Sequence, residues 1–62
     1  MVYICIFVFK GEIYYTYSDR GIHVFREGFW VNENLNLTDS LDMKYWIPPH
    51  KINYIEKYEE RE

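Results

Sequence analysis

The sequence predicts a small, mostly β fold of about five strands, either an SH3-like or Sm-like barrel or a curled antiparallel sheet. The chain has 62 residues, which is room for one domain over residues 1–62. β-branched and aromatic residues gather in short runs, and turns containing Gly separate these runs. Aromatic residues make up 21% of the chain, and their bulk can compensate for the small size of the core.

The first expected strand, Met1–Phe9, is apolar on both faces. Its β-branched residues occupy the even positions, while Cys5 and aromatic residues alternate with them. Such a strand is central in its sheet and covered on both sides, or it presents one face to another chain. Lys10 and Gly11 then form a tight turn, in which Gly11 adopts the positive φ that Lys10 resists.

The return strand, Glu12–Ser18, carries more tyrosine than a small core encloses easily. Tyr15 and Tyr17 share one face with Ile13, and Tyr14 lies on the other. Two interpretations of these rings stay open. They form a binding surface that stacks on bases or anchors a protein partner, or they fill a core that is short of aliphatic residues.

Two further strands are expected in the middle of the chain, each preceded by a turn. They are Ile22–Phe25 after the turn at Ser18–Gly21, and Phe29–Asn32 after the turn at Arg26–Gly28. In the first turn Asp19 can bond its own backbone. The segment Asn34–Asp42 shows neither strand alternation nor a helical stripe. It is expected to be a loop, with room for one helical turn capped by Thr38 or Asp39.

The last element has two interpretations, because Pro48 and Pro49 forbid a central strand at that point. Pro49 can occupy the first turn of a short C-terminal helix. Alternatively, the two prolines hold a 3₁₀ turn, after which Ile52–Lys57 forms a fifth strand that closes a small barrel. We favour the strand, with residues 57–62 as a frayed tail.

Charge and cysteine content narrow the classes of protein. The formal net charge of −3 argues against non-specific binding to nucleic acid, which needs clustered Lys and Arg, but is compatible with recognition of one RNA end or unpaired base. The apolar start of the chain is too short for a membrane helix and lacks the features of a signal peptide, so a cytoplasmic protein is expected. Cys5 is the only cysteine; it excludes an internal disulfide and is expected to be a small buried hydrophobe.

No pattern in the chain indicates an enzyme, a metal site or a cofactor site. His23 and His50 are the only histidines and have no carboxylate pair at ligand spacing. A polar and aromatic patch is expected instead around Trp46, His50 and Lys51, where an imidazole and an ammonium beside a stiff turn can bind phosphate oxygens. The alternative is that Trp46 and Ile47 complete the core while His50 and Lys51 are solvated.

The run Ile47–Ile55, I-P-P-H-K-I-N-Y-I, resembles a signature of the form I-P-x-H-[RK]-I-x-x-I. This signature closes a family of small archaeal domains proposed to recognise cyclic-phosphate ends of RNA, also called domain of unknown function 504. Ser18-Asp19 and Gly28–Val31 are similar to shorter segments of the same family, S-D-I and G-F-V. The resemblance implies RNA-end contacts near His50 and Lys51, with Arg20 on the preceding turn as a further candidate.

Two hypotheses of function follow. The first is a non-catalytic RNA-binding module, in which Trp46, Tyr15 or Tyr17 stacks on a base while Lys51 and its basic neighbours hold a terminal phosphate. The second is a protein-interaction module, such as a small virus-encoded inhibitor or an assembly subunit, that acts through its aromatic face. A homodimer is expected under either hypothesis, because pairing compensates for the small size of the chain.

Overall fold

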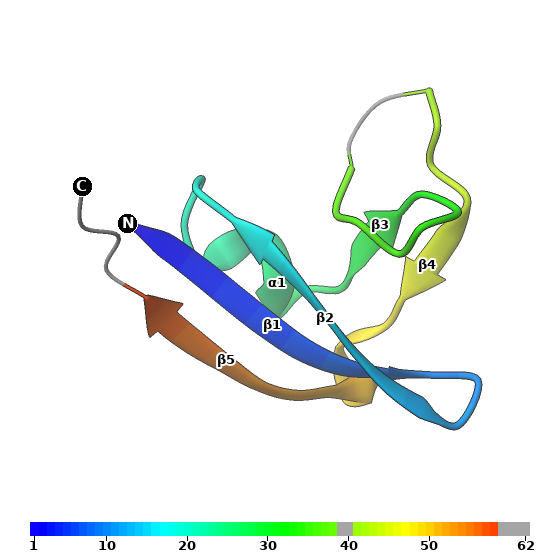
Figure 1. Cartoon of the computed structure of the whole chain (residues 1–62), viewed down its shortest axis with the longest axis horizontal. Coiled ribbons are helices and arrows are strands. Elements are labelled where there is room, and N and C mark those ends of the chain that lie inside the picture. Colours follow the sequence, from blue (N-terminus) through cyan, green and yellow to red (C-terminus); the bar gives the residue numbers. More distant parts are fainter. Residues whose placement is uncertain (39–40, 59–62) are drawn as a thin grey trace.

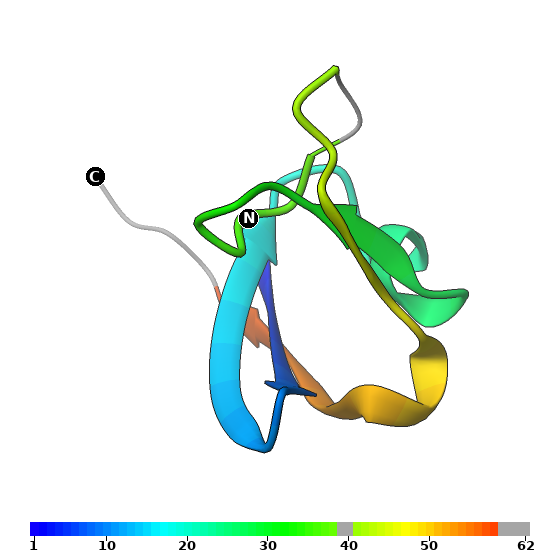
Figure 2. The same ribbon diagram turned by 90° about the vertical axis from the view of Figure 1, so that its right-hand side faces the viewer.

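The computed structural model describes residues 1–38 and 41–58. Within these residues the protein is mostly β, as predicted, with two antiparallel sheets and one short α-helix (Figure 1). The elements follow one another in the order β1 (Val2–Phe9), β2 (Glu12–Ser18), α1 (His23–Arg26), β3 (Phe29–Val31), β4 (Tyr45–Ile47), the 3₁₀ helix η1 (Pro49–Lys51) and β5 (Ile52–Tyr58). The sheets form two layers, seen edge-on in Figure 2.

β1 is the central strand of the larger sheet, whose order is β2-β1-β5. Phe9 pairs with Glu12, so Lys10 and Gly11 form a two-residue turn as expected. The expectation that Lys10 avoids positive φ is wrong, because φ is 51° at Lys10 and 80° at Gly11. Turns of this kind need positive φ at both positions to match the twist of the strands. Lys10 Nζ also lies 5.4 Å from the Phe9 ring centroid and 5.6 Å from that of Tyr45, which favours this conformation.

The smaller sheet pairs β3 with β4, and Trp30 lies opposite Trp46 across the two strands. The strand expected at Phe29–Asn32 is confirmed as β3, which ends one residue earlier. The sequence did not predict β4, since Tyr45–Ile47 is too short to show alternation and ends at a diproline.

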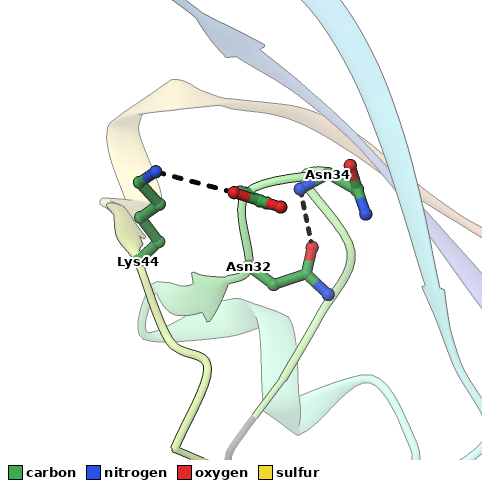
Figure 3. A network of polar contacts seen from close by, with 4 residues as sticks. Asn32, Asn34 and Lys44 are labelled. Carbon is green, nitrogen blue, oxygen red and sulfur yellow. Dashed lines mark hydrogen bonds and ion pairs between the residues drawn. The ribbon is translucent and has the colours of Figure 1, made fainter.

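The side chain of Asn32 shapes the loop that follows β3 (Figure 3). Its Oδ1 accepts hydrogen bonds from the backbone N–H groups of Asn34 at 2.9 Å and Asn36 at 3.1 Å. The N–H group of Leu37 then donates to Oγ1 of Thr16, a buried residue of β2, at 2.9 Å. The loop is therefore tied to both sheets, and Thr16 has a partner for its buried hydroxyl.

The rest of this connection returns the chain to β4. The Thr38 N–H group donates to the Trp30 carbonyl at 3.0 Å, while Asp39, the other expected helix cap, lies outside the described residues. Lys44 Nζ is 3.8 Å from Oε2 of Glu33 (Figure 3). Both side chains are exposed, so this ion pair contributes little to stability.

The hydrophobic core lies between the two sheets (Figure 2). Its buried side chains come from both layers and from α1: Cys5, Phe7, Phe25, Phe29, Val31 and Ile47. The Phe29 ring meets Phe7 and Phe25 edge-on, with centroid distances of 5.5 and 5.2 Å. Edge-to-face contacts of this kind add to the stability that burial provides. Ile52 and Ile55 of β5 pack against the same core.

The strand expected at Ile22–Phe25 is wrong, because this segment forms the single helical turn α1. The Phe25 N–H group donates to the Ile22 carbonyl at 3.0 Å. In α1 the Phe25 side chain is buried while His23 and Arg26 are exposed. A strand would place His23 on the same face as Phe25, towards the core. Packing therefore overrides the β propensity of the segment.

Across the described residues the strands form no closed barrel. Because α1 stands where a third strand was expected, no described strand forms backbone hydrogen bonds that join β2 to β3. The larger and smaller sheets therefore remain separate. The two-layer arrangement encloses the core that a barrel would have enclosed.

The diproline segment folds in the way that we favoured from the sequence. Pro49–Lys51 is a 3₁₀ helix and Ile52–Tyr58 is β5, so the interpretation as a C-terminal α-helix is wrong. The Lys51 N–H group donates to the Pro48 carbonyl at 3.0 Å, which closes the turn. Residues 59–62 of the expected tail lie outside the described residues.

The burial of Cys5 predicts low thiol reactivity. Burial raises its pKa from 9.0 to about 11, because the thiolate is disfavoured away from water. We expect alkylation by iodoacetamide at pH 8 to be at least about tenfold slower in the folded protein than in urea, since the thiolate is the reacting form. The pKa of Cys5 is higher in the folded protein than in the unfolded chain. Ionisation of this thiol therefore leaves the free energy of unfolding unchanged below pH 9 and lowers it as the pH rises towards 11. Equal alkylation rates in the folded protein and in urea would contradict the burial of Cys5.

Candidate functional site: two exposed aromatic surfaces

The outer face of the larger sheet is an almost continuous apolar and aromatic surface. Cys5 and Phe7 of β1 point into the core, so the even-numbered residues of β1 point outward. Their partners on the edge strands share that face. We name it the tyrosine face, and it consists of Val2, Ile4, Ile6, Val8, Ile13, Tyr15, Tyr17, Tyr54, Glu56 and Tyr58.

Strand register arranges the tyrosine face in cross-strand rows. Tyr15 and Tyr54 flank Ile6 on its two sides, and Tyr17 and Glu56 flank Ile4. The rings come from the edge strands, and the branched aliphatic side chains come from the central strand except for Ile13 of β2. Three strands of this length cover roughly 25 by 14 Å, from about 3.3 Å per residue and 4.8 Å between strands.

Much of the tyrosine face is open to solvent. Its edge-strand apolar side chains (Ile13, Tyr15, Tyr17, Tyr54 and Tyr58) are between 56% and 66% exposed, and the β1 residues between them are half-buried. Soluble monomers rarely expose contiguous apolar patches larger than a few hundred Å², and larger patches mark interaction sites. Among the ten residues of the face, Glu56 is the only charged one, and there is no Lys, Arg or His.

A second aromatic surface lies on the outer side of the smaller sheet. Trp30 and Trp46 are 41% and 45% exposed, and their ring centroids are 5.5 Å apart with an interplanar angle of 58°. They line a shallow hollow of about 320 Å³, together with Met43, Val24 and Arg20. We name it the tryptophan hollow. It lies on the layer opposite the tyrosine face, because the core separates the two sheets.

Gly28 seats the Trp46 ring. A Cβ atom at this position would lie 2.5 Å from Cζ2 of Trp46 and 2.9 Å from the Ile47 carbonyl oxygen, and φ is 91°. Only glycine therefore fits beneath the indole. Sequence analysis treated Gly28 as a turn residue and did not single out Trp30. Strand alternation is the signal in the sequence that could have found Trp30. Phe29 and Val31 face the core, so the residue between them points outward.

The structure places the predicted site residues in three regions, and Arg20 adjoins two of them because it also lines a hollow with Val2 and Tyr17. Arg20 and Trp46 both line the tryptophan hollow. Tyr15 and Tyr17 lie exposed on the tyrosine face, whereas Tyr14, on the other face of β2, packs against the core. The two interpretations of these rings therefore hold for different residues.

His50 and Lys51 are exposed on η1 and do not line the tryptophan hollow. The turn between β2 and α1, which carries Arg20, lies apart from the 3₁₀ helix η1 in both views (Figures 1 and 2). The fold therefore does not gather the expected phosphate-binding residues around one point. The alternative interpretation, in which Trp46 and Ile47 complete the core, holds in part. Ile47 is in the core and His50 and Lys51 face solvent, but Trp46 is not buried.

Residues 1–38 and 41–58 were also compared with the requirements of a metal site and of a membrane-spanning helix. No three His, Cys, Asp or Glu side chains in this part of the chain come close enough to hold a metal ion. None of its helices has the length and apolar character that crossing a membrane requires.

Comparison of the chain with family models, with curated proteins and with solved structures gives no match. The resemblance of the Ile47–Ile55 run to the archaeal RNA-end family thus stays a prediction from the sequence. The proposals below rest on the two aromatic surfaces themselves.

Proposed function

We propose that this protein is a non-catalytic interaction module that docks a partner protein on the tyrosine face. The observation that carries the proposal is the composition of that face, where nine of ten side chains are aliphatic or aromatic and lie open to solvent or half-buried. Tyrosine is among the residues that contribute most to protein interfaces, since its ring brings a large contact area at low entropic cost.

A protein fits the tyrosine face better than RNA does. Tyrosine rings can stack on bases, but binding of a nucleic acid strand also needs cations along the path of the phosphates. The face has no Lys or Arg and carries the carboxylate of Glu56. Of the basic residues of the RNA hypothesis, His50 and Lys51 lie on η1, and Arg20 alone adjoins the tyrosine face, where it lines a hollow with Val2 and Tyr17. One guanidinium at the end of the face does not supply a row of cations.

The charge of the module defines the chemistry of the partner. A complementary surface has an apolar centre and at least one Lys or Arg that meets Glu56 at the edge strand. The net charge of −3 also steers a basic partner towards the module. A second copy would bring another −3 and its own Glu56, so we favour a different protein over the homodimer.

Affinity capture from a nuclease-treated lysate tests this proposal. We expect the wild-type protein to retain one stoichiometric basic partner, and a Tyr15→Thr, Tyr54→Thr double variant to lose it. Thr keeps the β propensity of both strands while removing the two rings beside Ile6. Trp30→Thr is the matched control, because it removes an exposed strand ring on the opposite layer and should leave capture unchanged.

Two results would contradict the proposal. One is a partner that the double variant retains as well as the wild type does. The other is recovery that depends on nucleic acid and disappears after nuclease treatment, which would favour the RNA hypothesis. Light scattering of the purified chain distinguishes self-association: we expect a mass near 7.7 kDa. A dimer that the double variant cannot form would identify the partner as a second copy.

A further inference from the structure

We propose that the tryptophan hollow is a second binding site, which takes a planar ring carrying an anionic group. This inference is independent of the proposed function, because none of the residues that line the hollow is among the ten of the tyrosine face, although Arg20 also lines a neighbouring hollow with Val2 and Tyr17. Three properties of the hollow support it: the aromatic walls, the charge of its one ionisable residue, and its size.

The walls offer aromatic surface to a third ring. Trp30 and Trp46 are each more than 40% exposed, and their mutual tilt of 58° means that neither ring covers the other in a parallel stack. The Gly28 backbone fixes Trp46 from beneath, so the indole is positioned before any ligand arrives. Met43, 45% exposed, adds a thioether that packs favourably against aromatic rings.

The charge in the hollow selects an anion. Among the described residues that line the hollow, Arg20 is the only one with an ionisable side chain. A guanidinium binds carboxylate or phosphate oxygens through two parallel hydrogen bonds. Arg20 also interacts within the chain, so a bound anion would share the guanidinium with that partner.

The size of the hollow limits the ligand to a single ring system. Its volume of about 320 Å³ lies at the lower end of the range of roughly 300–1,000 Å³ for small-molecule sites. A nucleoside monophosphate and an aromatic carboxylate share the required chemistry. The site is shallow, so we expect dissociation constants in the millimolar range.

Tryptophan fluorescence reports directly on this site, because Trp30 and Trp46 are the only tryptophans in the chain. The probes are AMP with adenosine as its neutral counterpart, and phenylacetate with phenylacetamide. We expect one charged probe to give a saturable change at least fivefold tighter than its neutral counterpart, and added salt to reduce this preference. The pair that shows the preference tells whether the natural anion is a phosphate or a carboxylate.

The Arg20→Gln variant tests whether Arg20 causes the preference for charged over neutral probes. We expect the variant to bind the charged and neutral probes equally, whereas Arg26→Gln, which removes an exposed arginine outside the hollow, keeps the wild-type ratio. Circular dichroism confirms that both variants are folded, and the salt titration of the wild type tests the same point without a substitution. The proposal is overturned by no saturable change below 20 mM of probe, by equal binding of charged and neutral probes to the wild type, or by an Arg20→Gln variant that keeps the preference.

Discussion

Replacing Phe7 with alanine is expected to unfold the protein at 25 °C. Phe7 is fully buried in the central strand, where its ring contacts Phe29 edge-on at 5.5 Å and Tyr14 at 6.2 Å. Removing a buried Phe ring costs about 3–5 kcal/mol. A domain of this size typically has a net stability of only about 3–5 kcal/mol, so the loss equals the whole margin.

Far-ultraviolet circular dichroism and urea denaturation measure this effect. Ile13→Ala is the matched control, because Ile13 lies on the same sheet but is 66% exposed, and its replacement should shift the urea midpoint only slightly. A folded Phe7→Ala protein with a midpoint close to that of the wild type would show that the core does not depend on this ring.

Replacing Gly28 with alanine is expected to produce the second largest effect. A Cβ atom there would lie 2.5 Å from the Trp46 ring and 2.9 Å from the Ile47 carbonyl oxygen, so the end of β4 must move. The left-handed backbone, with φ at 91°, costs roughly 1–2 kcal/mol for a residue with a side chain. Overpacking adds about 1–3 kcal/mol. We expect a lower urea midpoint together with a changed tryptophan emission spectrum.

Gly11→Ala separates the two causes. Gly11 also has positive φ, at 80°, but a Cβ atom there would meet nothing within 4 Å. The Gly11→Ala variant should therefore lose only the free energy that positive φ costs a residue with a side chain, and its tryptophan emission should be unchanged. Equal destabilisation by the two alanine variants would mean that Gly28 does not position Trp46.

Local signals in the sequence were sufficient for the elements formed by near neighbours. The hairpin of β1 and β2 follows from two apolar runs around Lys10-Gly11. The diproline left a helix and a 3₁₀ turn followed by a strand both open, and the favoured second alternative is the one observed. Both depend on residues within a few positions of one another. Strand alternation also placed Tyr15 and Tyr17 on one face, but whether that face is exposed or fills the core stayed open until the structure showed both rings exposed.

Elements that depend on distant contacts were not predicted. Ile22–Phe25 has the composition of a strand, yet it forms α1 because only Phe25 is needed in the core. β4 is three residues long and is stabilised by pairing with β3, more than ten residues earlier in the chain. The tyrosine face also needed the register of β1 with β5, because that pairing brings Tyr54 beside Ile6.

The affinity of the captured partner for the double variant tests the central claim most directly. By titration calorimetry with the purified partner, we expect Tyr15→Thr, Tyr54→Thr to weaken binding at least about tenfold, since tyrosine is enriched among the interface residues whose truncation costs about 2 kcal/mol or more. Trp30→Thr should bind as the wild type does. Equal affinity of the wild type and the double variant would contradict the assignment of the tyrosine face as the docking surface.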